Sequence, residues 1–158
     1  MTQAEALEEL RERVEALKAP TLSDPTLTRI LTRTTRVKNF AVGAAYQRGQ
    51  FIAPASANLA TYQGAVYLVT VGGVSSTEPS WPTGPGVAAV SGLVQFVYFG
   101  PLDPYDLQEA TREGWKQKMS KAAELIHAKE AGVDQDWQQI YEQCERRWRA
   151  CGPAVVVG

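Results

Sequence analysis

The sequence predicts an α+β protein: a bundle of about four helices with an inserted small all-β module and an extended C-terminal tail. Apolar residues recur every three or four positions near both ends of the chain, as they do in amphipathic helices. Between them, residues 39–102 contain only two charged side chains, Arg48 and Glu78, and are rich in glycine, proline, valine and aromatic residues. The last residues begin with Pro153, which cannot continue a helix, and have no side-chain charge.

These changes in composition set the expected domain boundaries. Residues 1–38 and 103–151 are predicted to form one discontinuous helical domain, with residues 39–102 as the inserted module and residues 152–158 as the tail. A chain of 158 residues corresponds to about one domain, or to one domain with a small insertion. Insertion at the tip of a loop between helices is of the tolerated kind.

The first helix is expected over residues 2–18, where leucine and valine form a narrow seam of the kind used in helix pairing. Pro20 breaks it. Ser23 or Asp24 is then expected to cap a second helix, with Pro25 near its first position.

Three arginines on the second helix lie opposite its apolar face. Arg29, Arg33 and Arg36 are spaced at i, i+4 and i+7, which places them on one side of a helix. One interpretation is a solvated helix face. The other is a row of cations that faces an acidic partner or a DNA backbone.

Strand-like runs follow at residues 46–52, 65–71 and 93–99, and glycine-containing turn signals separate them. Trp81 stands in one of the connecting loops. Its ring either fills the small core of the module or presents a face to a sugar.

A helical hairpin is predicted over residues 104–148. Pro104 stands at the first helical position of its long first helix, Gly132 is expected to end that helix, and Asp134 or Asp136 to cap the next. The short join predicts an antiparallel pair. The expected helical core consists of Leu107, Trp115, Met119, Trp137, Tyr141 and Trp148.

The sequence gives no indication of catalysis. No GxSxG motif or phosphate-binding loop is found, and the single histidine, His127, cannot build a His-based metal site. Cys144 and Cys151 are expected to be free thiols. The net charge of −1 gives no case for bulk attraction to nucleic acid. No apolar run approaches the roughly 18 residues that span a bilayer, and the acidic, polar first residues are unlike a signal peptide. We therefore expect no enzyme, cofactor, metal or membrane association.

Several short motifs resemble head–tail connector (adaptor) proteins of tailed bacteriophages. The helical motifs are Tyr105-Asp106-Leu107, Glu113-Gly114-Trp115-Lys116 and Ile140-Tyr141-Glu142-Gln143-Cys144, together with the opening segment at residues 21–31. The charge-poor interval resembles a repeat-like β unit of phage virion proteins, with its motifs at residues 46–54, 67–82 and 91–100. It departs from that pattern at Gln50 and Ser91, where acidic residues are usual, and at Phe96, where tryptophan is usual.

The resemblance implies a structural virion protein at the neck of the particle, made in the host cytoplasm. Such proteins form a ring, commonly of twelve subunits, which docks beneath the portal, joins it to a tail-side stopper or tail terminator protein, and passes double-stranded DNA through its centre. The alternative is a carbohydrate- or surface-binding module on a helical base in a phage particle.

The resemblance also implies that the C-terminal tail reaches the portal. The segment concerned is Pro153, Ala154, Val155, Val156 and Val157. Its three valines have high β propensity, so it is expected to add a strand to a sheet edge of the portal or of a neighbouring subunit. Pairing with the β module of its own chain is the other possibility.

Overall fold

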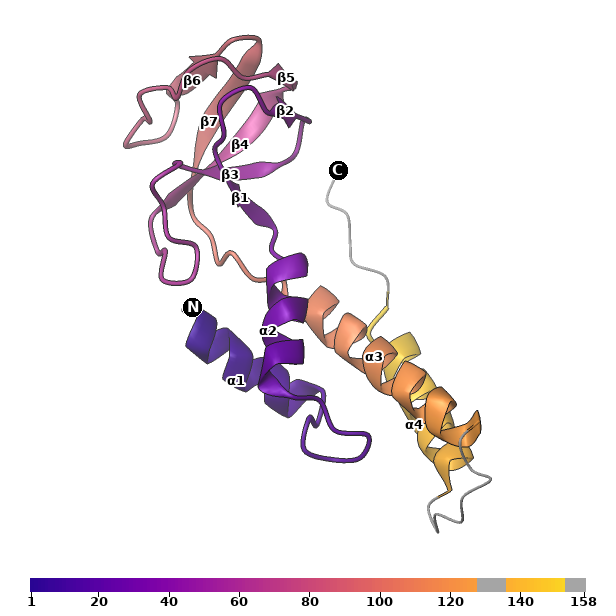
Figure 1. Ribbon diagram of the computed structural model, residues 1–158. Helices are drawn as coiled ribbons and strands as arrows, with labels where there is room; N and C mark the ends of the chain where they lie inside the picture. Colours follow the sequence, from indigo (N-terminus) through magenta and orange to yellow (C-terminus); the bar gives the residue numbers. More distant parts are fainter. Residues whose placement is uncertain (128–135, 153–158) are drawn as a thin grey trace. The chain divides into compact units, whose positions relative to one another are not determined.

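The structure is a computed structural model that describes residues 1–127 and 136–152 (Figure 1). The described residues form two compact units. One contains the strands and is built from residues 1–3 and 35–105; the other contains the helices and is built from residues 4–34 with the described residues after 105.

The β unit contains a five-stranded mixed sheet and a separate two-stranded ribbon. The sheet has the order β1-β3-β4-β7-β6, in which β1 pairs parallel with β3 and the other pairs are antiparallel. The ribbon pairs β2 with β5. The strands are β1 (Val37–Asn39), β2 (Ala45–Tyr46), β3 (Phe51–Ala53), β4 (Ala65–Val71), β5 (Gly73–Val74), β6 (Ala88–Ser91) and β7 (Val94–Pro101).

The burial of alternate side chains explains why these segments form a sheet. In β7, Val94 and Phe96 are fully buried, whereas the neighbouring Gln95 and Val97 are only half-buried, as expected for a strand with one face on the core. In β4 the alternation breaks where Val66 and Tyr67 are both buried. A register shift against β7 falls between these two residues, and such an irregularity re-aims the side chains that follow it.

An aromatic cluster forms the main core of the β unit. The ring of Phe96 lies edge-on to Phe40, Tyr46 and Trp81, with centroid separations of 6.0, 5.8 and 5.3 Å. Edge-to-face pairs at these distances are the favourable arrangement for aromatic rings. A smaller cluster around Val37 and Val66 packs elsewhere in the same unit.

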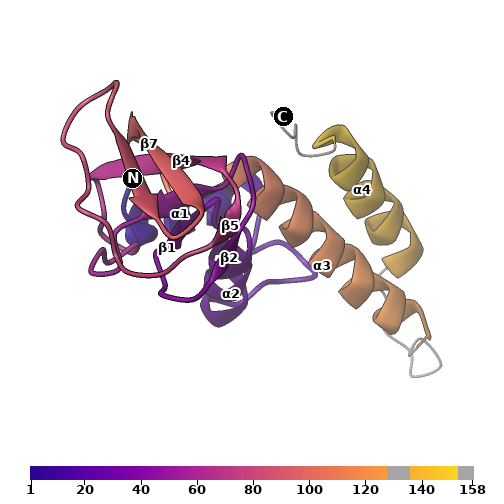
Figure 2. The same ribbon diagram turned by 90° about the horizontal axis from the view of Figure 1, so that it is seen from above.

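The helical unit contains α1 (Gln3–Arg13), α2 (Asp24–Arg33), α3 (Leu107–His127) and α4 (Trp137–Ala150). Helices α3 and α4 run antiparallel and side by side in Figures 1 and 2. Asp136 caps α4 by accepting a hydrogen bond from the backbone N–H of Gln139 at 3.2 Å, whereas Asp134 and Gly132 lie outside the described residues.

Helix α1 ends at Arg13 and not at residue 18 as predicted. Glu15 adopts a φ of 48°, a left-handed conformation that cannot continue a right-handed helix. The apolar spacing continues through Leu17, but that side chain is 82% exposed. The turn that follows α1, residues 14–18, is called the α1 turn below.

The predicted fold class, a helical bundle with an inserted small β module, is wrong. The described residues form a mixed α and β protein with four helices and a five-stranded sheet, and strands dominate the middle of the chain. The reason lies in β1, whose parallel pairing with β3 brings Val37 and Lys38 into the sheet, and in the bridge between Thr35 and Tyr105. The β region therefore begins before residue 39 and forms one of the two compact units of the described residues, with its own core.

Candidate functional site

The most unusual side chain of the helical unit is a buried lysine. Lys118 of α3 is only 1% exposed, and its ammonium group donates hydrogen bonds to the backbone carbonyls of Val14, at 2.9 Å, and Glu15, at 2.6 Å. It also lies 5.0 Å from the centre of the Trp115 ring. Charge-assisted hydrogen bonds and a ring face offset the cost of removing an ammonium group from water.

These contacts explain how the α1 turn is held. The last carbonyls of a helix have no partner within the helix, and cationic side chains can satisfy them. Val14 and Glu15 lie just beyond the end of α1, and Lys118 donates to their carbonyls in a similar way from another helix, α3. Its burial lowers the pKa of the Lys118 ammonium below the ordinary value, an effect that the nearby Glu15 carboxylate opposes.

Glu15 links the α1 turn to α4. Its carboxylate lies 3.2 Å from Nζ of Lys18 and 3.8 Å from the guanidinium of Arg147. The hydrogen bond from Lys18, with the charge of that lysine and of Arg147, holds the pKa of Glu15 below its usual value. Arg147 in turn lies 5.8 Å from the centre of the Trp115 ring.

A pocket of about 660 Å³ opens between the α1 turn, α3 and α4. It is called the α1-turn pocket. Its lining combines four cationic side chains with one carboxylate, several apolar groups and a buried thiol. The lining residues are Glu15, Lys18, Ala19, Trp115, Lys118, Ile140, Gln143, Cys144, Arg146, Arg147 and Ala150. Burial raises the pKa of the Cys144 thiol, so this group favours its protonated form.

The predicted arginine row is divided between the two units. Arg29 and Arg33 are exposed on α2, beside a shallow hollow that also includes Asp24 and Thr28. Arg36 lies beyond the end of α2, so a helical face does not place it with the other two.

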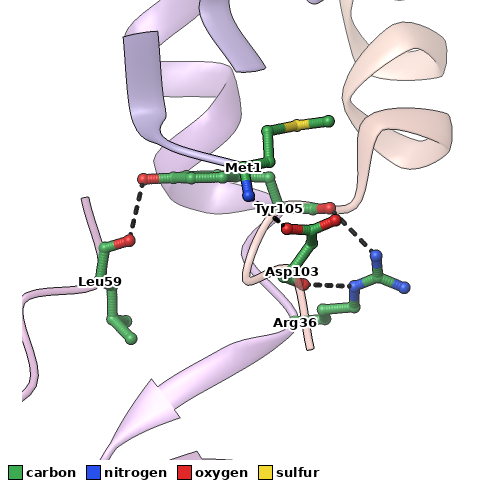
Figure 3. Close-up of polar contacts among 5 residues, drawn as sticks. All are labelled: Met1, Arg36, Leu59, Asp103 and Tyr105. Atoms are coloured by element: carbon green, nitrogen blue, oxygen red, sulfur yellow. Dashed lines mark hydrogen bonds and ion pairs between the residues drawn. The ribbon is translucent and has the colours of Figure 1, made fainter. Parts of the chain in front are cut away.

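Arg36 instead has a structural role in the β unit (Figure 3). Its guanidinium donates hydrogen bonds to the backbone carbonyls of Asp103, at 3.0 Å, and Tyr105, at 3.3 Å. The Asp103 carboxylate pairs with the ammonium group of Met1 at 2.7 Å, and the Tyr105 hydroxyl donates to the carbonyl of Leu59 at 3.4 Å. Arg36 therefore joins the beginning and the end of the segment 35–105 that forms most of the β unit.

The predicted helical core residues do not all lie in a core. Trp115 and Trp137 are buried, at 6% and 8% exposure. The other four are half-buried: Leu107, Met119, Tyr141 and Trp148. Trp148 lies beneath the guanidinium of Arg112, which is 5.1 Å from the ring centre.

Trp81 packs against the core of the β unit. Its ring centre lies 4.5 Å from that of Tyr67, and its indole N–H donates to the Glu78 carboxylate at 2.9 Å. The same carboxylate accepts from the N–H of Ala55 at 2.8 Å. Of the two interpretations of Trp81, these contacts support the core-filling one.

The remaining predicted features do not add to the candidate site. His127 is an exposed residue at the end of α3, and the C-terminal segment Pro153–Val157 lies outside the described residues. Within residues 1–127 and 136–152, no group of three or more His, Cys, Asp or Glu side chains is placed to hold a metal ion. None of the helices described is long and apolar enough to cross a bilayer.

Sequence reasoning missed Lys118, although a signal was present. Lys118 follows Trp115 by three positions and precedes Ala122 by four, so a charged residue stands in the middle of the apolar stripe of α3. A charge at such a position is rarely buried without partners, and its presence could have pointed to a polar contact between helices.

Comparison of the chain with protein-family models, with curated proteins and with solved structures found no match. The case for a function therefore rests on the residues and their arrangement.

Proposed function

We propose that this chain is a structural protein of a tailed-phage particle, a head–tail connector that forms a ring beneath the portal. It links the portal to a tail-side neck protein and surrounds the DNA channel. No catalytic role is part of the proposal. In this interpretation Arg29 and Arg33, both exposed on α2, face DNA or an acidic group of an adjoining subunit.

The observation that supports the proposal most is where the connector-like motifs lie. Gly114 and Trp115, from the central motif, are both buried in α3, and Cys144, from the last motif, is buried in α4. A Cβ added at Gly114 would lie 2.6 Å from Cγ1 of Val14. The motif residues thus fix how the helices approach one another, and shared packing positions of this kind are what a common helical scaffold requires.

The β unit departs from the acidic residues in the pattern of phage β units at two positions, and in each case the side chain has a hydrogen bond within the unit. At two positions where acidic residues are usual, this chain has other side chains that accept hydrogen bonds. Gln50 accepts from the N–H of Gln47 at 3.0 Å, and Ser91 accepts from the N–H of Ser76 at 3.0 Å. Both departures are therefore accommodated within the β unit.

The test is assembly with the portal. The full chain and a variant truncated after Gly152 are each mixed with the portal protein of the same phage, and the products are followed by sedimentation and electron microscopy. The full chain is expected to form closed rings that attach to the portal. The truncated chain is expected to fold but to lose attachment, because three valines buried on a sheet edge would contribute roughly 1.5–3 kcal/mol each before the cost of ordering them.

Two results would count against this proposal. A full chain that remains monomeric at all concentrations and never sediments with the portal would refute the connector function. A truncated chain that docks as well as the full one would remove the tail from the portal contact.

A further inference from the structure

The α1-turn pocket has an excess of positive charge that its own carboxylate does not balance. Even without the buried Lys118, the three cations Lys18, Arg146 and Arg147 face a single carboxylate. That carboxylate, Glu15, already lies close to two of them, Lys18 and Arg147.

Arg146 is the cation that Glu15 does not reach. Among the described residues it has no ion-pair partner, and its Nε–H makes only a long contact, 3.5 Å, with the carbonyl of Glu142 one turn earlier in the same helix. Most N–H groups of its guanidinium are therefore available to a bound ligand. A guanidinium binds a carboxylate through two parallel hydrogen bonds, which gives both strength and direction.

The walls of the pocket indicate which kind of anion fits. Trp115, Ile140 and the alanines of the lining supply apolar surface around the cations. Leu17, next to Lys18 in the chain, does not line this pocket. It lines an adjoining hollow, which shares Glu15 and Lys18 with the pocket, and at 82% it is the most exposed large apolar side chain among the described residues. A nucleic-acid backbone would cover cations but offers little to an exposed leucine, whereas a peptide can present both carboxylates and aliphatic side chains.

We propose that the α1-turn pocket binds an acidic segment of a partner protein, with a carboxylate on Arg146 and Lys18 and an aliphatic side chain against Leu17. The buried ammonium of Lys118 holds the α1 turn in place and adds positive charge to the wall of the pocket. This inference does not depend on the connector function, because it follows from the charges and walls of the helical unit alone.

The experiment uses the full chain labelled with nitrogen-15 and a short capped peptide of alternating glutamate and leucine. Addition of the peptide is expected to shift the backbone amide signals of Gln143, Cys144 and Arg146 and the indole signal of Trp115. A peptide with glutamine in place of glutamate should produce much smaller shifts, and added salt should weaken binding because the exposed cations are screened.

A pair of variants tests the assignment of the cations. The double variant Lys18→Gln/Arg146→Gln should weaken peptide binding about tenfold or more, because both exposed donors are lost. The control is Arg149→Gln, an exposed arginine of the same helix that pairs with Glu145 and does not line the pocket. The affinity of this control variant for the peptide should stay within about twofold of that of the unsubstituted chain.

Three outcomes would overturn the proposal. The first is an absence of shifts at the named signals at millimolar peptide. The second is equal weakening by the double variant and by the Arg149→Gln control, which would indicate general surface charge. The third is a short DNA duplex that shifts the same signals and displaces the peptide, which would assign the surface to nucleic acid.

Discussion

The contact between Gly114 of α3 and Val14 of the α1 turn leads to a quantitative prediction. Replacing Gly114 with alanine places a methyl carbon 2.6 Å from Cγ1 and 3.3 Å from Cβ of Val14. Val14 is fully buried, and its β-branched side chain has few alternative rotamers, so it cannot turn away at low cost. Overpacking of this kind costs about 1–3 kcal/mol, while alanine gains about 1 kcal/mol in a helix interior, so we expect a net loss of up to about 2 kcal/mol.

A double-mutant cycle isolates this contact. Val14→Ala alone removes two buried methyl groups and should cost about 1–3 kcal/mol. In the double variant, the new methyl group at Gly114 occupies part of the space that Val14 leaves. The two losses should therefore not add, and the coupling should favour the double variant by about 1 kcal/mol or more.

The assay must report on the helical unit alone, since the chain has two compact units and its unfolding need not be two-state. Hydrogen exchange of the α3 amides gives the free energy of opening for that unit. Ser120→Ala, at an exposed position of the same helix, serves as the control and should change the stability by less than about 0.5 kcal/mol. If Gly114→Ala stabilises the helix by the propensity gain alone and shows no coupling to Val14, the close approach described above is wrong.

Two further predictions concern titratable groups. Lys118→Met removes both hydrogen bonds to the carbonyls of the α1 turn, so it should lower stability by about 2 kcal/mol in the same exchange assay. The exposed Lys116→Met should have almost no effect, and equal effects of the two variants would show that Lys118 does not stabilise the α1 turn. Burial raises the pKa of Tyr62, Tyr67 and Tyr105, so the folded β unit keeps protons that the unfolded chain loses above about pH 10. Its stability in urea should therefore be unchanged up to about pH 9 and fall as the pH rises further, and a flat profile up to about pH 11 would contradict this.

The parts of the fold that the sequence predicted well are those with a helix cap or with an apolar repeat that extends over many residues. Helix α3 follows from its apolar spacing, although it begins at Leu107 and not at Pro104 as predicted. Helix α4 follows from Asp136, one of its two expected caps, and from the aromatic residues behind it. Strand β7 follows from alternation over Val94 and Phe96. In each case one local pattern extends over enough residues to specify the element without knowledge of its neighbours.

The parts that sequence missed depend on contacts between distant segments. Strand β1 has only three residues, and nothing local distinguishes it from a loop; its parallel partner β3 makes it a strand. Arg36 continues the spacing of Arg29 and Arg33 but lies beyond the helix. Its hydrogen bonds go to the backbone carbonyls of Asp103 and Tyr105, which are distant in the sequence. The left-handed conformation just after α1 is adopted by Glu15 and not by a glycine, so the sequence does not indicate it.

Gly114 and Lys118 act together, since they lie one turn apart on α3 and both meet the α1 turn. Without a side chain at Gly114, Val14 can approach α3 closely, and that approach brings the carbonyls of the α1 turn within reach of the Lys118 ammonium. The same turn supplies Glu15 and Lys18 to the α1-turn pocket. A residue that pushes the turn away from α3 should therefore weaken peptide binding without touching the pocket. Gly114→Ala should lower the affinity for the acidic peptide, and Val14→Ala in the same chain should restore part of it; an affinity that Gly114→Ala leaves unchanged would show that the turn does not position the pocket.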